Sequence, residues 1–266
     1  MGSLTGTIAV VTGASRGAGR GIASVLGEAG ATIYVTGHSV RGALSKPELA
    51  GTTIEDTAEL VTVRGGVGIP VRVDHTVDGE IEALFEQVRQ EHGRLDLLVN
   101  NAWGGYEDYA HHGGDATVFD VVFWAHPIER WDKMWTAGVR ATLATTRAAL
   151  PLMFSQQKGI IINTTLEIDP SFYDAALYYR TAKLAINYLT FGMAHDIYRR
   201  GGLPIPVVGL ALEWMRTEGA GEFPRGTASA WGAGTDRLRR AWRTRRPCSG
   251  ERPQPFREDR EDPARA

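Results

Sequence analysis

Residues 7–19 read TIAVVTGASRGAG, and this stretch decides the fold. An apolar run from Thr7 to Val11 is followed at once by a turn that contains Gly13, Gly17 and Gly19. Apolar residues at helical spacing come next. A buried strand, a glycine turn and an amphipathic helix, in that order, are typical of the first unit of a parallel sheet with crossover helices. The stretch therefore predicts an α/β protein.

The same alternation continues to about residue 218. Further short apolar runs that read as strands occupy residues 32–35, 69–73, 95–99, 159–163 and 205–210. Segments with helical spacing lie between them, for example over residues 81–88. Continuous apolar strands separated by amphipathic helices indicate a parallel sheet covered on both faces. We expect a single Rossmann-type doubly wound domain over residues 1–218.

Residues 219–266 have a different composition. They contain no Val, Ile, Met, Lys, Tyr or Asn, and Arg, Gly, Pro and Ala dominate. Strands are usually built from β-branched and aromatic residues, so this segment has little material for one. We expect an irregular tail that adds no seventh strand to the sheet. An out-of-frame reading of a GC-rich gene and an unusual natural tail both fit this change.

The overall composition narrows the function classes. A net charge of -2 gives no reason to expect a nucleic-acid partner. No apolar run approaches the roughly 20 residues that span a bilayer, and the single Cys248 excludes an internal disulfide. His75, His111, His112 and His126 lack the spacing of metal ligands and read as solvated loop histidines. We expect a cytoplasmic protein without membrane, nucleic-acid or metal partners.

The glycine turn is a candidate cofactor site. Glycines at this place let the backbone approach a pyrophosphate, whose charge faces the N-terminus of the following helix. Gly13, Gly17 and Gly19 would form the floor of the site, and Ser15 and Arg16 lie in the same loop. The alternative is a plain strand–helix turn. The position directly after the first strand favours the cofactor interpretation.

Cofactor selectivity should be determined where the second strand ends. A carboxylate there favours NAD, because it accepts from the ribose 2′-hydroxyl, whereas a basic group accommodates the 2′-phosphate of NADP. Residues 36–39 contain His38 and no acid, and Arg16 and Arg41 supply positive charge. NADP is therefore favoured over NAD. If Arg16 and His38 are simply solvated, the preference stays open. Asp74 either accepts from the adenine amino group or caps the next segment.

Three motifs together resemble the short-chain dehydrogenase/reductase family. They are the glycine turn at residues 12–19, Asn100-Asn101-Ala102 after the fourth strand, and Tyr179-Arg180-Thr181-Ala182-Lys183 on a helix. The likeness covers Thr7 to about Glu218. Residues 131–140 and 214–218 are most similar to the branch called dehydrogenase/reductase SDR family member 1.

The resemblance implies a nicotinamide cofactor, a Tyr–Lys pair, a Ser or Thr partner and a relay Asn. It also implies cofactor contacts at Asn101 and Ala102, and a homodimer or homotetramer. The pair makes chemical sense, because a tyrosine with a pKa of about 10 needs a nearby ammonium to gain phenolate character. Lys183 lies four residues after Tyr179, on the same helix face, and can also bind the nicotinamide ribose. The alternative is that Tyr179 and Lys183 are an ordinary pair of surface residues on an amphipathic helix.

Three positions depart from the family pattern. The partner serine lies thirteen residues before the tyrosine, where this chain has Leu166. A one-residue insertion would place Thr165 in that role, and we favour it over Thr164, which alternation puts on the other face. Gly138 occupies the position of the relay Asn. Glu213 stands where the family has glycine, and adds negative charge near the cofactor.

The sequence therefore predicts NADP(H)-dependent hydride transfer to a carbonyl, or from a secondary alcohol. Tyr179 would donate the proton, Thr165 would hold the oxygen, and Lys183 would lower the pKa of the tyrosine. A non-catalytic nucleotide sensor and a damaged, inactive enzyme are the rival hypotheses. One aromatic set either lines an apolar substrate pocket or belongs to the core: Trp103, Tyr106, Tyr109, Phe119, Phe123 and Trp124.

Overall fold

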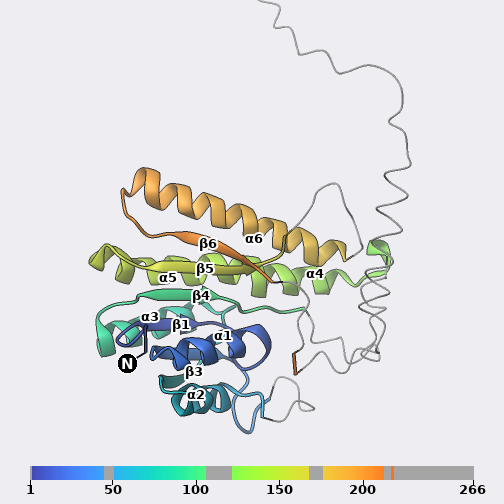
Figure 1. The fold of residues 1–266 in the computed structure, drawn as a ribbon. Coiled ribbons are helices and arrows are strands. Elements are labelled where there is room, and N and C mark those ends of the chain that lie inside the picture. Colours follow the sequence, from blue (N-terminus) through green and yellow to red (C-terminus); the bar gives the residue numbers. More distant parts are fainter. Residues whose placement is uncertain (1, 45–50, 106–121, 168–175, 213–216, 219–266) are drawn as a thin grey trace, which may run out of the picture. The chain divides into compact units, whose positions relative to one another are not determined.

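A computed structural model describes residues 2–44, 51–105, 122–167, 176–212 and 217–218. Its sheet is parallel throughout, with the strand order β3-β2-β1-β4-β5-β6 (Figure 1). The strands are β1 (Ile8–Val11), β2 (Thr32–Gly37), β3 (Val67–Arg72), β4 (Leu97–Asn100), β5 (Ile160–Thr165) and β6 (Val207–Ala211). The strands from β1 to β3 are added toward one edge of the sheet and those from β4 to β6 toward the other, so the strand order reverses between β1 and β4. Doubly wound sheets bind ligands in the crevice at this point, beyond the carboxyl ends of the strands.

Helices cover both faces of the sheet. They are α1 (Gly17–Glu28), α2 (Ile54–Val63), α3 (Asp78–His92), α4 (Ile128–Met134), α5 (Ala141–Gln156) and α6 (Leu177–His195), with the shorter turns η3 (Phe123–Ala125), η4 (Trp135–Arg140) and η5 (Asp196–Arg200). Alternate residues of β1 divide between the two cores. Ala9 and Val11 pack with α1 and α2, whereas Ile8 and Val10 pack with α3 and α5. This is the alternation expected of a strand buried on both sides.

A buried chain of polar side chains fixes the two helices α5 and α6 against the middle of the sheet. The Asn100 amide donates to Thr146 Oγ1 of α5 at 2.9 Å and to Asn163 Oδ1 of β5 at 2.8 Å. Asn163 in turn donates to Thr190 Oγ1 of α6 at 2.9 Å. Each of these groups is buried, so losing one partner would leave a costly unsatisfied group. The network therefore holds α6 in a defined position.

The predicted fold class is confirmed, because all six expected strands form one parallel sheet. The expectations for the tail at 219–266 and for the residues at 106–121 lie outside the described residues. Among the described helices, none combines the length and the hydropathy that a membrane span requires.

Candidate active site

The glycine turn between β1 and α1 requires its glycines for steric reasons. Gly13 and Gly17 have φ values of +61° and +57°, in the region that side chains rarely adopt. A Cβ on Gly13 would lie 2.7 Å from the Cα of Ala102, and one on Gly19 would lie 2.4 Å from the carbonyl oxygen of Gly13. The loop therefore packs tightly on the end of β4 and on itself. Larger residues would push it out of this shape.

Asn101 holds the glycine turn to the end of β4. Its side-chain amide donates to the carbonyl oxygens of Thr12 at 3.0 Å and Gly13 at 3.1 Å. The hydroxyl oxygen of Thr12 accepts from the backbone N–H groups of Asn101 and Ala102 at 2.8 and 2.9 Å. Asn101 thus bonds to backbone next to the candidate cofactor site, and its implied contact with the cofactor stays a prediction. Two motifs that are distant in sequence form one rigid unit.

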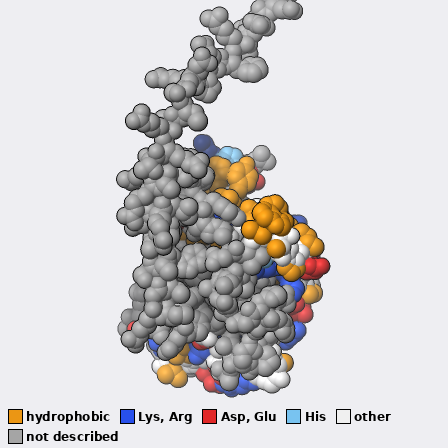
Figure 2. Space-filling view, turned by 90° about the vertical axis from the view of Figure 1, so that its right-hand side faces the viewer, with side chains coloured by type: hydrophobic (Ala, Val, Ile, Leu, Met, Phe, Trp, Pro, Cys, Tyr) orange, Lys and Arg blue, Asp and Glu red, His pale blue; other side chains and the backbone are white. Residues whose placement is uncertain are grey.

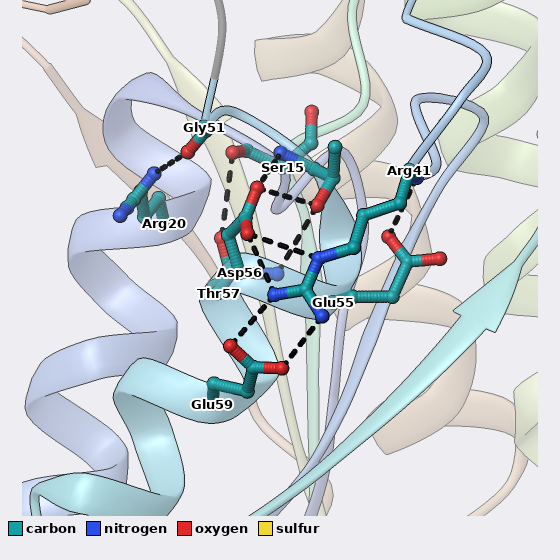
Figure 3. A network of polar contacts seen from close by, with 9 residues as sticks. Ser15, Arg20, Arg41, Gly51, Glu55, Asp56, Thr57 and Glu59 are labelled. Carbon is teal, nitrogen blue, oxygen red and sulfur yellow. Dashed lines mark hydrogen bonds and ion pairs between the residues drawn. The ribbon is translucent and has the colours of Figure 1, made fainter.

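The end of β2 differs from the sequence-based expectation in its charges. His38 is exposed, but the guanidinium of Arg41 is held by two carboxylates of α2 (Figure 3). It donates to Asp56 Oδ1 at 2.8 and 3.2 Å and to the two oxygens of Glu59 at 2.6 and 2.7 Å. We expected Arg41 to supply positive charge for a 2′-phosphate, yet its charge is already matched by Asp56 and Glu59. Arg16 lies at the N-cap of α1.

Asp74, which follows β3, acts as a turn residue in this structure. Its Oδ1 accepts from the backbone N–H of Thr76 at 2.9 Å and from the Thr76 hydroxyl at 2.7 Å. Burial acts to raise the pKa of Asp74, but the hydrogen bonds from Thr76 outweigh it and lower the pKa. Oδ1 of Asp74 thus bonds to the segment that follows β3, as in the capping alternative for this residue. The adenine contact stays a prediction.

Tyr179 and Lys183 lie together at the start of α6. The Lys183 ammonium is 5.6 Å from the centre of the Tyr179 ring, and it donates to the carbonyl oxygen of Thr164 at 3.2 Å. Lys183 is 7% exposed, and burial lowers its pKa to about 8. With a pKa near 8, Lys183 is still protonated in most molecules at pH 7. The pair therefore places a poorly hydrated cation beside a tyrosine, which favours the phenolate form.

Trp103 completes this group from the end of β4. The Lys183 ammonium lies 4.1 Å above the centre of a Trp103 ring, and the ring meets Tyr179 edge-to-face at 5.3 Å between centroids. A cation over an indole face is a favourable contact, especially when it is desolvated. From the sequence, Trp103 either lines a substrate pocket or belongs to the core. The structure adds a third possibility, a contact surface for the lysine, which only the packing of β4 against α6 reveals.

The neighbouring Tyr178 has a different environment. Its hydroxyl donates to the carbonyl oxygen of Phe123 at 3.3 Å, and its ring packs edge-to-face on Trp131. It thus ties η3 to α6. The two tyrosines point to different places because adjacent helical residues are rotated by about 100°. This contrast favours Tyr179 over Tyr178 as the chemically useful residue.

Neither threonine at the end of β5 makes a simple partner for Tyr179. The Thr165 hydroxyl donates to Asn187 Oδ1 at 2.6 Å, two turns further along α6. The Thr164 hydroxyl donates to the carbonyl oxygen of Asn100 at 3.3 Å. Both side chains are buried. To hold a substrate oxygen, Thr165 would have to turn away from Asn187, so its predicted role stays a prediction.

The packing around Gly138 leaves no room for the side chain of a relay Asn. It lies in the π-helical turn η4, and a Cβ placed on it would come within 2.5 Å of the Trp103 ring. The space that a side chain would use is therefore filled by Trp103. π-Helical turns of this kind are frequent at functional sites.

Replacing Gly138 with Ala is expected to lower the free energy of unfolding by about 1–3 kcal/mol, because overpacking displaces the Trp103 ring. Urea unfolding of the two chains measures this. Gly192→Ala is the matched control on α6, since its added Cβ meets nothing within 4 Å. Equal loss or no loss in both variants would contradict the steric argument.

The histidines and remaining aromatics divide into three groups. His75 is 5% exposed, so its assignment as a solvated loop histidine was wrong. Phe123 and Trp124 are half-exposed or more, so neither is a core residue. The predictions for His111, His112, Tyr106, Tyr109 and Phe119 lie outside the described residues. The part of the chain that the structure describes contains no group of three His, Cys, Asp or Glu able to hold a metal ion.

Comparison with known proteins decides the family. The model of the short chain dehydrogenases matches residues 7–227. The chain belongs to this family. Among its relatives, dehydrogenase/reductase SDR family member 1 is 33% identical over 223 residues in Mus musculus and 34% identical over 200 residues in Homo sapiens. The family predicted from the sequence is thus confirmed, and relatives that carry the name of the predicted branch are among the matches.

The coverage of these comparisons is unequal. The two alignments include 83% and 74% of this chain, but only 64% and 58% of the relatives. The chain therefore spans about three-fifths of the length of these short-chain dehydrogenase relatives. A solved metagenomic short-chain oxidoreductase in complex with NADP is 27% identical, with a TM-score of 0.62, over 80% of this chain and 85% of that one.

Proposed function

We propose that this short-chain dehydrogenase transfers a hydride between NADP(H) and a small-molecule carbonyl or secondary alcohol. In the reductive direction the cofactor supplies the hydride to the carbonyl carbon. Tyr179 donates a proton to the developing alkoxide, Lys183 favours phenolate character in Tyr179 and binds the ribose, and Thr165 holds the substrate oxygen. Gly13, Ser15, Gly17, Gly19 and Ala102 line the cofactor site, and the proposed compartment is the cytoplasm.

The observation that carries this proposal is the burial of the Lys183 ammonium beside Tyr179. The partners of this buried cation are two aromatic rings and one carbonyl, and among the described residues no carboxylate forms an ion pair with it, so it contributes little to stability. Such a costly arrangement fits a site where the cation acts on a tyrosine. Trp103 contacts both residues and directly follows Ala102, whose backbone N–H bonds to Thr12 at the start of the glycine turn, which places the pair near the proposed cofactor site.

The NADP preference now depends on fewer residues. No acid follows β2, which removes the usual acceptor for the ribose 2′-hydroxyl of NAD. The similar metagenomic oxidoreductase is in complex with NADP. Because Asp56 and Glu59 hold Arg41, Arg16 and His38 remain as the groups proposed to contact a 2′-phosphate.

NADPH is expected to bind at least tenfold more tightly than NADH, because pairing a phosphate with arginine gains about 1.4 kcal/mol or more. Fluorescence titration at physiological salt measures both dissociation constants. Arg16→Ala should narrow the ratio, whereas Arg41→Ala, the matched control, should change it less. Equal affinities for the two cofactors in the unmodified chain would contradict the NADP assignment.

A nucleotide sensor is the second candidate, favoured by Gly138 and by the occupied space beside it. The same fluorescence titration, followed by a screen of aldehydes and ketones, separates the candidates. Binding with turnover supports the enzyme, and binding without turnover supports the sensor. A chain that binds no cofactor is the damaged enzyme.

A homodimer or homotetramer is also proposed. One face of α6 carries large apolar side chains that are exposed by 47% at Leu184, 76% at Tyr188 and 66% at Phe191. These positions recur at helical spacing and form a single stripe. Figure 2 also shows hydrophobic side chains, in orange, gathered on the described surface. Exposed apolar surface of this kind often marks a protein interface.

A further inference from the structure

The N-terminus of α1 is capped by a residue that follows β6. The backbone N–H of Gly17 donates to Oε2 of Glu218 at 2.7 Å, across 201 positions of the sequence. The other carboxylate oxygen lies 3.8 Å from Nε of Arg20. A Cβ on Gly17 would lie 3.4 Å from the Thr217 side chain. Thr217 and Glu218 therefore lie directly on the glycine turn.

The helix has no anion of its own at this end. Its N-cap residue, Arg16, forms no side-chain capping bond, and its first turn contains no acidic residue. The first N–H groups of a helix have no partners within the helix, and the helix dipole makes this end positive. Glu218 supplies the missing anion from a distant part of the chain. Its carboxylate occupies an anion site that the glycine turn creates.

A dinucleotide cofactor needs the same site. Its pyrophosphate would accept from the N–H groups at the start of α1 and face the same helix end. One N–H group cannot fully serve two anions, and two anions at one place repel each other. We propose that Glu218 competes internally with the cofactor's pyrophosphate and thereby sets the affinity for the cofactor. This inference rests on the proposed function, since it assumes that a dinucleotide binds at the glycine turn.

The competition has a thermodynamic consequence. When a site is free for only a fraction of the time, the measured affinity is reduced by that fraction. Cofactor binding must therefore displace Glu218 from Gly17, and by reciprocity the Glu218 contact must weaken cofactor binding by the same factor. A residue that merely stabilised the loop would act in the opposite direction. Its removal would weaken binding.

The test compares the full chain with Glu218→Gln and Glu218→Ala. Glu28→Gln is the matched control, because Glu28 lies at the other end of α1 and forms an exposed ion pair with Arg64. NADPH binding is followed by fluorescence, and binding of inorganic pyrophosphate by calorimetry. We expect both Glu218 variants to bind both probes about fivefold more tightly, which is within the range of a carboxylate at a helix N-terminus. Glu28→Gln should bind like the unmodified chain.

Each outcome separates the two claims. Unchanged or weaker binding of both probes in the Glu218 variants overturns the competition. Tighter pyrophosphate binding without NADPH binding in any chain supports the competition and contradicts the proposed function. If no chain binds pyrophosphate, the glycine turn is not an anion site and the competition is wrong.

Discussion

Tyr179→Phe is expected to lower kcat by about a hundredfold or more, while the dissociation constant of NADPH changes little. The substitution keeps the ring that packs on Trp103 and removes only the hydroxyl. Loss of a positioned proton donor typically costs a factor of 100 to 10,000, and about a hundredfold corresponds to roughly 2.7 kcal/mol of transition-state stabilisation. Steady-state turnover of a carbonyl substrate and fluorescence titration of NADPH measure the two quantities.

Tyr178→Phe is the matched control for this prediction. Its hydroxyl contacts the carbonyl oxygens of Phe123 and His126, so its loss should affect stability rather than chemistry. A neutral hydrogen bond contributes about 1 kcal/mol, and turnover should stay within a factor of a few. If Tyr178→Phe abolishes turnover and Tyr179→Phe does not, the chemical assignment is wrong by one residue. If neither variant loses turnover, the Tyr–Lys mechanism is wrong.

The fold was predictable because its signals are local and repeated. Each buried strand is a short apolar run, and the glycine turn after Val11 marks the first crossover. Patterns of this kind depend on the backbone and on burial, so they can be recognised without knowledge of long-range contacts. The pairing of Tyr179 with Lys183 followed in the same way, since residues four apart on a helix share a face.

The errors share a different physical cause, because each depends on which distant side chain is nearby. Arg41 reads as a basic group near the cofactor until α2 brings Asp56 and Glu59 onto it. His75 reads as a loop residue until α5 covers it. The contacts of Trp103 and Glu218 were not predicted for the same reason, since they join segments far apart in the sequence.

His75 shows how such a contact controls stability. Its Nε2 lies 2.8 Å from the Thr36 hydroxyl of β2, and its Nδ1 lies 3.1 Å from the Thr145 hydroxyl of α5. Burial lowers its pKa from 6.5 to about 4; Asp74 and Glu80 act in the other direction, and His38 adds to the lowering. Near neutral pH the folded chain therefore holds an uncharged imidazole that joins two elements of the core.

The sign of the pH effect follows from proton binding in the two states. Between pH 6.5 and about 4 the unfolded chain protonates this histidine and the folded chain does not. The contribution of His75 to the free energy of unfolding is therefore largest above pH 6.5, and it falls as the pH drops toward 4. A shift of this size corresponds to about 3 kcal/mol, an order-of-magnitude value for a group almost wholly buried.

Urea unfolding between pH 7 and pH 4.5 measures this effect. The window stays above the ordinary pKa of Asp56 and Asp78, so these two carboxylates contribute little to the slope. The pKa values of Glu59, Glu86 and Glu91 are also lowered in the folded chain, and these groups contribute equally in the unmodified chain and in the variants. His75→Gln retains a donor and an acceptor but does not titrate, so its stability should depend much less on pH, even if it is lower at pH 7. Exposed His195→Gln is the matched control for the replacement of a histidine by glutamine. Parallel pH profiles for the unmodified chain and His75→Gln would show that a different group causes the acid sensitivity.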